Sequence, residues 1–197
     1  YLQSSGNLSE KYQSLVLERL ACTYRALRDI DKAEALANSA VEVAQASPDR
    51  AYLGYALMAR AAVAAERGDD RLAIESYKEA HQVFKDQGRS IECALVLNNL
   101  SGCYFSTRRF KAARRACDAT MKIALELGQL RLQALALTML GELEYREGDS
   151  RSAQAHWNRA VAIARRFRDR VLRFKIEFLL FRTALEEGRT AAARAVQ

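Results

Sequence analysis

The chain has 197 residues, of which 50% are hydrophobic and 28% are charged, and its formal net charge at pH 7 is +7. This balance is typical of a folded soluble protein and excludes a disordered chain. No run of about 18 uncharged apolar residues occurs, so we expect no membrane-spanning segment. The chain starts at Tyr1 and has no signal-peptide pattern, and we interpret it as a cytoplasmic fragment of a longer protein. Its abundant arginine and alanine indicate a GC-rich, bacterial source.

The chain has one proline and nine glycines, and so few breakers predict an almost entirely helical protein. Apolar residues at helical spacing predict nine helical segments. In chain order they are residues 9–27, 31–46, 50–67, 70–87, 90–107, 110–127, 130–147, 150–167 and 170–187. A turn at Gly6 and Asn7 is expected before the first helix. Another is expected at Gly188, followed by a last helix that Thr190 caps.

The breakers between these helices recur every 40 residues. The inner turns fall on Arg28, Gly68, Arg108, Gly148 and Gly188, and the outer turns on Pro48, Gly88, Gly128 and Arg168. Glycine reaches the left-handed conformation at a helix C-terminus at little cost. The helices that end at arginine are therefore expected to end less cleanly.

Alanine has the same period. It recurs at Ala33, Ala73, Ala113, Ala153 and Ala193. A fixed period of this length is the signature of a repeat array. Short turns make the two helices of each pair antiparallel, and the pairs must stack to bury their apolar faces. We expect one domain over residues 1–197, with full repeats at about 14–53, 54–93, 94–133 and 134–173 and partial repeats at both ends.

The repeat at 134–173 has a recognisable pattern. It contains Leu137, Leu140, Gly141, Gly148, Ala153, Trp157 and Ala160. This pattern resembles the tetratricopeptide repeat (TPR), whose usual unit has about 34 residues. The longer period is similar to that of kinesin light chain and of bacterial regulators of the MalT and Rap type. The resemblance implies an all-α, right-handed superhelix, with Trp157 and its equivalents Tyr77 and Cys117 as core residues.

In the resembled family, the first helix of each pair lines a concave groove that holds the ligand. The corresponding candidates for partner binding are Arg25, Met58, Asn98, Asn99, Phe105, Tyr145, Arg146 and Arg182. The run LNNLSGCY at 97–104 resembles kinesin light chain repeats, which implies that Asn99, and then Asn98, clamps a peptide backbone through its amide. Aromatic side chains would supply anchors. Alternatively, these side chains are solvated or pack on the following repeat.

The sequence offers no chemistry beyond binding. The four cysteines are interpreted as small buried thiols of a reducing compartment, and neither histidine has a neighbour at metal-ligand spacing. No catalytic triad, Cys/His arrangement or phosphate loop is present. We therefore expect no enzymatic activity, no cofactor and no metal.

The sequence predicts a scaffold that binds a protein or peptide, as the sensor or docking region of a larger bacterial regulator. An oligomerisation or assembly scaffold, which could associate through the cut repeat ends, is the alternative. The arginine-rich runs at 108–115 and 165–173 raise a third hypothesis, nucleic-acid binding. It is disfavoured because acidic residues intersperse these runs and no recognition motif accompanies them.

Overall fold

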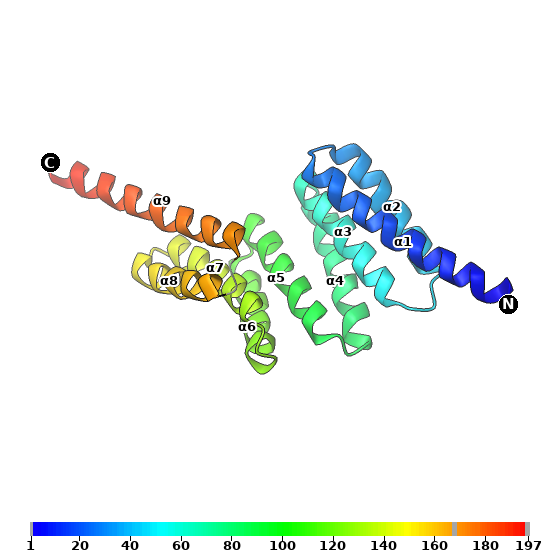
Figure 1. Cartoon of the computed structure of the whole chain (residues 1–197). Coiled ribbons are helices and arrows are strands. Elements are labelled where there is room, and N and C mark those ends of the chain that lie inside the picture. The colour runs from blue at the N-terminus through cyan, green and yellow to red at the C-terminus, as the bar shows by residue number, and fades with distance from the viewer. Residues whose placement is uncertain (1, 167–168, 196–197) are drawn as a thin grey trace. The chain divides into compact units, whose positions relative to one another are not determined.

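The computed structural model describes the backbone of residues 2–166 and 169–195, and the side chains of 12–166, 169–186 and 188. This part of the chain forms nine α-helices and no strand (Figure 1). They are α1 (Leu2–Ala26), α2 (Ile30–Gln45), α3 (Ala51–Arg67), α4 (Asp70–Asp86), α5 (Ser90–Ser106), α6 (Phe110–Glu126), α7 (Leu130–Arg146), α8 (Ser150–Arg166) and α9 (Arg170–Ala195). The all-α fold expected from the sequence is confirmed, and the helix boundaries from the end of α1 to the start of α9 agree with the expected ones to within one or two residues.

The helices divide between two compact units, Tyr1–Arg109 and Phe110–Gln197. In unit 1, α1 packs on α2 and α3, and each later helix up to α5 packs on the one before it. In unit 2, α7 packs on α6, α8 on α7, and α9 on α8. Each unit is therefore built from sequential antiparallel neighbours. The single array across residues 1–197 and its repeat boundaries stay a prediction.

The turns between helices contain residues in the left-handed conformation. The glycines in this conformation are Gly68, Gly88, Gly128 and Gly148, with φ of 89°, 67°, 63° and 91°. Arg28 and Arg108 adopt it as well, with φ of 66° and 57°. The predicted weaker ends at arginine therefore have the same backbone as the glycine turns, at a higher conformational cost. Arg168, the third such arginine, lies outside the described residues.

Aspartates fix the helix starts that follow several of these turns. A carboxylate at the N-cap accepts a backbone N–H that has no partner within the helix. The pairs are Asp29 with the N–H of Lys32 at 3.3 Å, Asp69 with Leu72 at 3.0 Å, Asp149 with Ser152 at 3.0 Å, and Asp169 with Leu172 at 2.9 Å. The turn and the cap together determine where each helix ends and the next begins.

Two predicted turns were wrong, and both lie near an end of the chain. Gly6 and Asn7 are inside α1, and Gly188 and Thr190 are inside α9. Continuing the existing helix adds one backbone hydrogen bond per residue, which outweighs the roughly 1 kcal/mol cost of an interior glycine.

The alanine column packs in the core. Ala33, Ala73, Ala113 and Ala153 are fully buried, while the side chain of Ala193 lies outside the described residues. One turn further on, Tyr77, Cys117 and Trp157 are buried as predicted. The indole N–H of Trp157 donates to the carbonyl of Thr138 at 3.1 Å, so its one polar atom is satisfied.

Candidate partner-binding site

Unit 1 contains five of the predicted partner-binding residues, all on the first helices of the predicted pairs. Arg25 is on α1, Met58 is on α3, and Asn98, Asn99 and Phe105 are on α5. All five side chains are half-buried. They combine one cation, two apolar side chains and two amides, which suits a partner with both backbone and apolar groups.

The two asparagines form a small polar network with Tyr77 of α4. The amide of Asn98 donates to the side-chain oxygen of Asn99 at 3.5 Å, and Asn99 in turn hydrogen-bonds to the Tyr77 hydroxyl. Burial raises the pKa of Tyr77 far above its ordinary value, so its hydroxyl stays protonated. Within the described part of the chain, the side-chain oxygen of Asn98 accepts no hydrogen bond. Asn98 is therefore the amide with most capacity for a ligand.

Sequence reasoning assigned Tyr77 to the core and missed its hydroxyl. The ring is indeed buried, but the hydroxyl reaches the Asn99 amide on the next helix. The only signal available was a tyrosine in a column whose other members include Ala37, Cys117 and Trp157.

Arg25 also links helices. Its guanidinium forms an ion pair with Glu66 of α3, and Arg28 approaches the other oxygen of the same carboxylate at 3.0 Å. Unit 2 has an equivalent contact 120 residues later, where the Tyr145 hydroxyl donates to Glu186 of α9. Both contacts span 41 residues and join successive first helices. Arg25 and Tyr145 thus stabilise the stacking of these helices, whatever else they bind.

Of the predicted residues of unit 2, Arg182 lies against Tyr145. The centroid of the Tyr145 ring lies 5.9 Å from that of Trp157 on α8. The guanidinium of Arg182 on α9 lies 5.9 Å from the same Tyr145 centroid. Arg182 is half-buried, while Arg146 is exposed in the last turn of α7. The Tyr145 ring is therefore an ordered part of the packing between α7, α8 and α9.

Three arginines of the two basic runs form ion pairs with glutamates. Arg114 bridges Glu144 and Glu147 at 2.8 Å each, and Arg165 and Arg173 both lie 3.6 Å from Glu177. Asp169, within the second run, accepts from Arg131 at 3.1 Å. These ion pairs neutralise three of the arginines locally, which disfavours a continuous surface for phosphates.

Three of the four cysteines are partly or fully buried thiols of low reactivity at neutral pH. Burial raises the pKa of the Cys103 thiol to about 11, and the pKa values of Cys22 and Cys93 are also raised by burial, so thiolate is scarce at neutral pH. Among the side chains that the structure describes, no cysteine forms a disulfide and no group of three or more metal-ligating residues gathers. Nor does any helix in that part of the chain have the length and apolar character needed to cross a bilayer.

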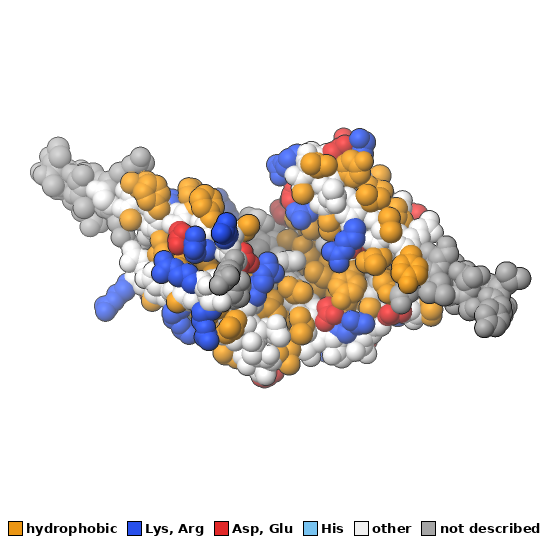
Figure 2. All heavy atoms as spheres, in the orientation of Figure 1, with side chains coloured by type: hydrophobic (Ala, Val, Ile, Leu, Met, Phe, Trp, Pro, Cys, Tyr) orange, Lys and Arg blue, Asp and Glu red, His pale blue; other side chains and the backbone are white. Residues whose placement is uncertain are grey.

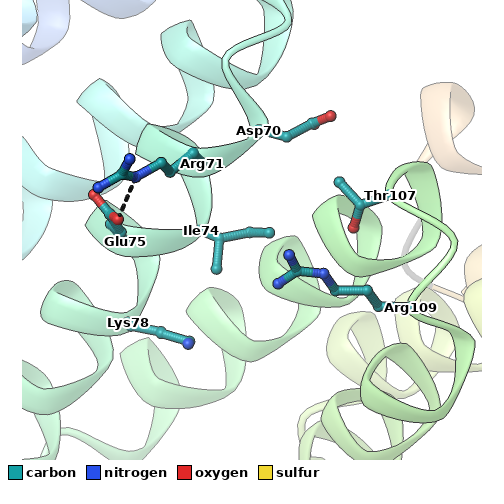
Figure 3. Close-up of a pocket in the computed structure, with 7 residues that line it drawn as sticks. All are labelled: Asp70, Arg71, Ile74, Glu75, Lys78, Thr107 and Arg109. Atoms are coloured by element: carbon teal, nitrogen blue, oxygen red, sulfur yellow. Dashed lines mark hydrogen bonds and ion pairs between the residues drawn. The ribbon is translucent and has the colours of Figure 1, made fainter.

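A pocket on the side of α4 was not foreseen. It has a volume of about 420 Å³ and lies between α4 and the segment that follows α5 (Figure 3). Lys78 of α4 and Arg109 after α5 both line it. The two residues are 31 positions apart in the sequence, with α5 between them, so no sequence pattern indicates that they lie together. We refer to this cavity as the α4 pocket.

Comparison with known proteins identifies the class. Residues 92–166 match the family model of the tetratricopeptide repeat. No curated protein sequence matches. The solved structures that are similar include aspartyl phosphate phosphatase F from Bacillus subtilis, with 15% identity over 92% of this chain and 48% of that one, at a TM-score of 0.78. The apo form of RapI matches with 16% identity over 86% of this chain and 47% of that one, at a TM-score of 0.73.

A putative kinesin light chain with TPR-like repeats from Podosopora anserina is also similar, with 14% identity over 91% of this chain and 89% of that one, at a TM-score of 0.68. BtubC (BKLC) from P. vanneervenii has 22% identity over 81% of this chain and 72% of its own, at a TM-score of 0.66. The chain spans about half the length of RapI and of phosphatase F. The fold and these comparisons define an α-helical repeat scaffold. Residues 92–166 match the tetratricopeptide repeat family, and the fold of the chain is that of the TPR-like repeat proteins it resembles.

Proposed function

We propose that this chain is a non-catalytic scaffold that binds a protein or an extended peptide, as the sensor or docking region of a larger bacterial regulatory protein. The ligand lies against the first helices, on Met58, Asn98, Asn99 and Phe105 in unit 1. Tyr145, Arg146 and Arg182 are the corresponding contacts in unit 2. The solved relatives with this fold include Rap proteins and kinesin-light-chain-like proteins, which supports a role in binding other proteins.

The amide pair of α5 is the observation that carries this proposal. Asn98 and Asn99 are adjacent, half-buried and hydrogen-bonded to each other. The side-chain oxygen of Asn98 is available to accept a further hydrogen bond. An asparagine side chain pairs with both the N–H and the C=O of an extended backbone. Met58 on α3 and Phe105 on α5 add apolar contact area, so backbone and side chains of a peptide would both be recognised.

An oligomerisation scaffold is the second candidate, and α9 favours it. Along this helix, Val171, Phe174, Phe178, Phe181 and Leu185 are each at least 45% exposed. Their spacing places them on one face of the helix, and Figure 2 shows hydrophobic side chains along the first part of α9. An exposed apolar stripe of this kind marks an interaction surface.

Peptide selection tests the first proposal. Twelve-residue peptides selected on the wild-type protein from a random library would be measured by fluorescence polarisation. We expect Asn98→Ala to weaken binding at least tenfold at an unchanged melting temperature. The matched control is Asn38→Ala, an exposed asparagine on α2 of the same unit. Equal affinities of wild type, Asn98→Ala and Asn99→Ala for every selected peptide would contradict the proposal.

Light scattering, which measures the molar mass in solution, tests the second candidate, the oligomerisation scaffold. If the α9 stripe mediates self-association, Phe174→Asp together with Phe178→Asp converts an oligomer into a monomer. A wild-type protein that is monomeric up to about 100 µM would exclude self-association as the function, since functional protein interfaces of this kind bind more tightly.

A further inference from the structure

The α4 pocket has an apolar floor and a charged rim. Ile74 lies at its base and is 5% exposed, whereas the rim consists of charged side chains of α4 and of Arg109. Figure 3 shows the side chains of Ile74, Lys78 and Arg109 pointing into the same space. The pocket belongs entirely to unit 1. Its volume of about 420 Å³ is within the range of about 300–1,000 Å³ that is usual for ligand sites.

The charges of the rim are unevenly compensated. Glu75 accepts from Arg71 at 2.9 Å, and Asp70 accepts a hydrogen bond from the Ser106 hydroxyl at 3.4 Å. In the part of the chain that the structure describes, Lys78 and Arg109 have no carboxylate partner. Two positive charges therefore face the same cavity without compensation, above an apolar side chain.

The arrangement selects among anions. Asp70 and Glu75 line the same cavity, so a polyphosphate or nucleic-acid backbone would meet two carboxylates as well as the cations. A single carboxylate between Lys78 and Arg109 avoids that repulsion and forms charge-assisted hydrogen bonds with both. The buried Ile74 then contacts the methylene groups of the side chain or an adjacent apolar residue.

We propose that the α4 pocket binds an acidic, partly apolar peptide segment of a protein partner, with one carboxylate held between Lys78 and Arg109. This site lies on α4, outside the proposed site on the first helices, and it does not require that site. A partner could contact the two sites together, which would raise its overall affinity well above that of either one.

The test uses a defined probe and NMR. The probe is a hexapeptide with blocked ends that contains one glutamate flanked by leucines, and the neutral control replaces this glutamate by glutamine. We expect the acidic peptide to shift the backbone amide signals of Ile74, Lys78, Thr107 and Arg109. The double variant Lys78→Gln, Arg109→Gln should weaken binding at least tenfold. Lys85→Gln, which removes an exposed charge from the same helix outside the pocket, should leave binding unchanged.

Several results would overturn the proposal. These are equal binding of the neutral peptide, equal weakening by Lys85→Gln, and the absence of shifts at the pocket amides. Inorganic phosphate or a single-stranded oligonucleotide that shifts the same amides at lower concentration than the peptide would overturn the assignment to a peptide carboxylate. Because the substituted side chains are exposed, all variants should keep the wild-type melting temperature, which distinguishes lost binding from lost folding.

Discussion

Gly141 of α7 lies directly against the indole of Trp157 on α8. A Cβ atom built at Gly141 would be 2.3 Å from Nε1 of Trp157 and 2.6 Å from Cδ1. The indole is fully buried and donates to the Thr138 carbonyl, so it cannot move away without losing that hydrogen bond. The glycine therefore sets how closely α7 and α8 approach.

We expect Gly141→Ala to destabilise unit 2 by about 1–3 kcal/mol, because it overpacks a rigid site. Urea denaturation measures the change. The matched control is Gly188→Ala in α9, where an added Cβ meets no atom within 4 Å. That change should be neutral or stabilising, since alanine is about 1 kcal/mol better than glycine inside a helix. Stabilisation by Gly141→Ala would show that the helices are not in close contact here.

Arg108 has a left-handed backbone, with φ of 57°, where glycine would be less strained. We expect Arg108→Gly to stabilise the protein by about 0.5–1 kcal/mol, because the saving in backbone strain exceeds the entropy gained by the unfolded chain. Arg28→Gly should gain less, since it also removes the 3.0 Å ion pair with Glu66. The converse change, Gly148→Ala, should destabilise, and thermal unfolding of the three variants gives the order.

His81 predicts a pH dependence of stability. Burial, together with the nearby charge of Lys85, lowers its pKa below the ordinary 6.5. The unfolded chain therefore binds a proton more readily than the folded one, and stability falls as the pH drops through about 6.5 toward the folded-state pKa. Urea midpoints between about pH 5.5 and 7.5 should rise with pH in the wild type and in His156→Gln. The slope should be smaller in His81→Gln, and an identical slope in all three would contradict the assignment.

The helices could be predicted from the sequence because local features repeat with the period. Ala153 and Trp157, for example, occupy the same places as Ala73 and Tyr77, and all four are buried. The period does not show whether a particular glycine ends a helix, and the turn expected at Gly188 was wrong because α9 continues through it.

The candidate site was harder to predict. A column alignment identifies side chains on one helix face, but it does not show which of them are used by neighbouring helices. Arg25 and Tyr145 share a column of the predicted groove, yet each contacts a glutamate 41 residues later. Lys78 and Arg109 come together only because the end of α5 lies beside α4. Contacts of this kind depend on the packing distance between helices, which periodicity does not encode.

Arg114 shows how the packing uses charges that looked available for a polyanion. Its guanidinium, on α6, lies 2.8 Å from Glu144 on α7 and 2.8 Å from Glu147 in the turn that follows α7. We expect Arg114→Ala to cost roughly 1 kcal/mol, because it removes two charge-assisted hydrogen bonds at a partly buried position. Arg114→Lys should recover only part of this, since an ammonium group cannot present the planar fork that reaches two carboxylates.

Arg115→Ala is the matched control, an exposed arginine on the same helix, and it should change stability by less than about 0.5 kcal/mol. Denaturant titrations at low and high salt measure all three variants. The loss in Arg114→Ala should shrink at high salt as screening weakens the ion pairs, and equal effects at Arg114 and Arg115 would show that the bridge contributes nothing.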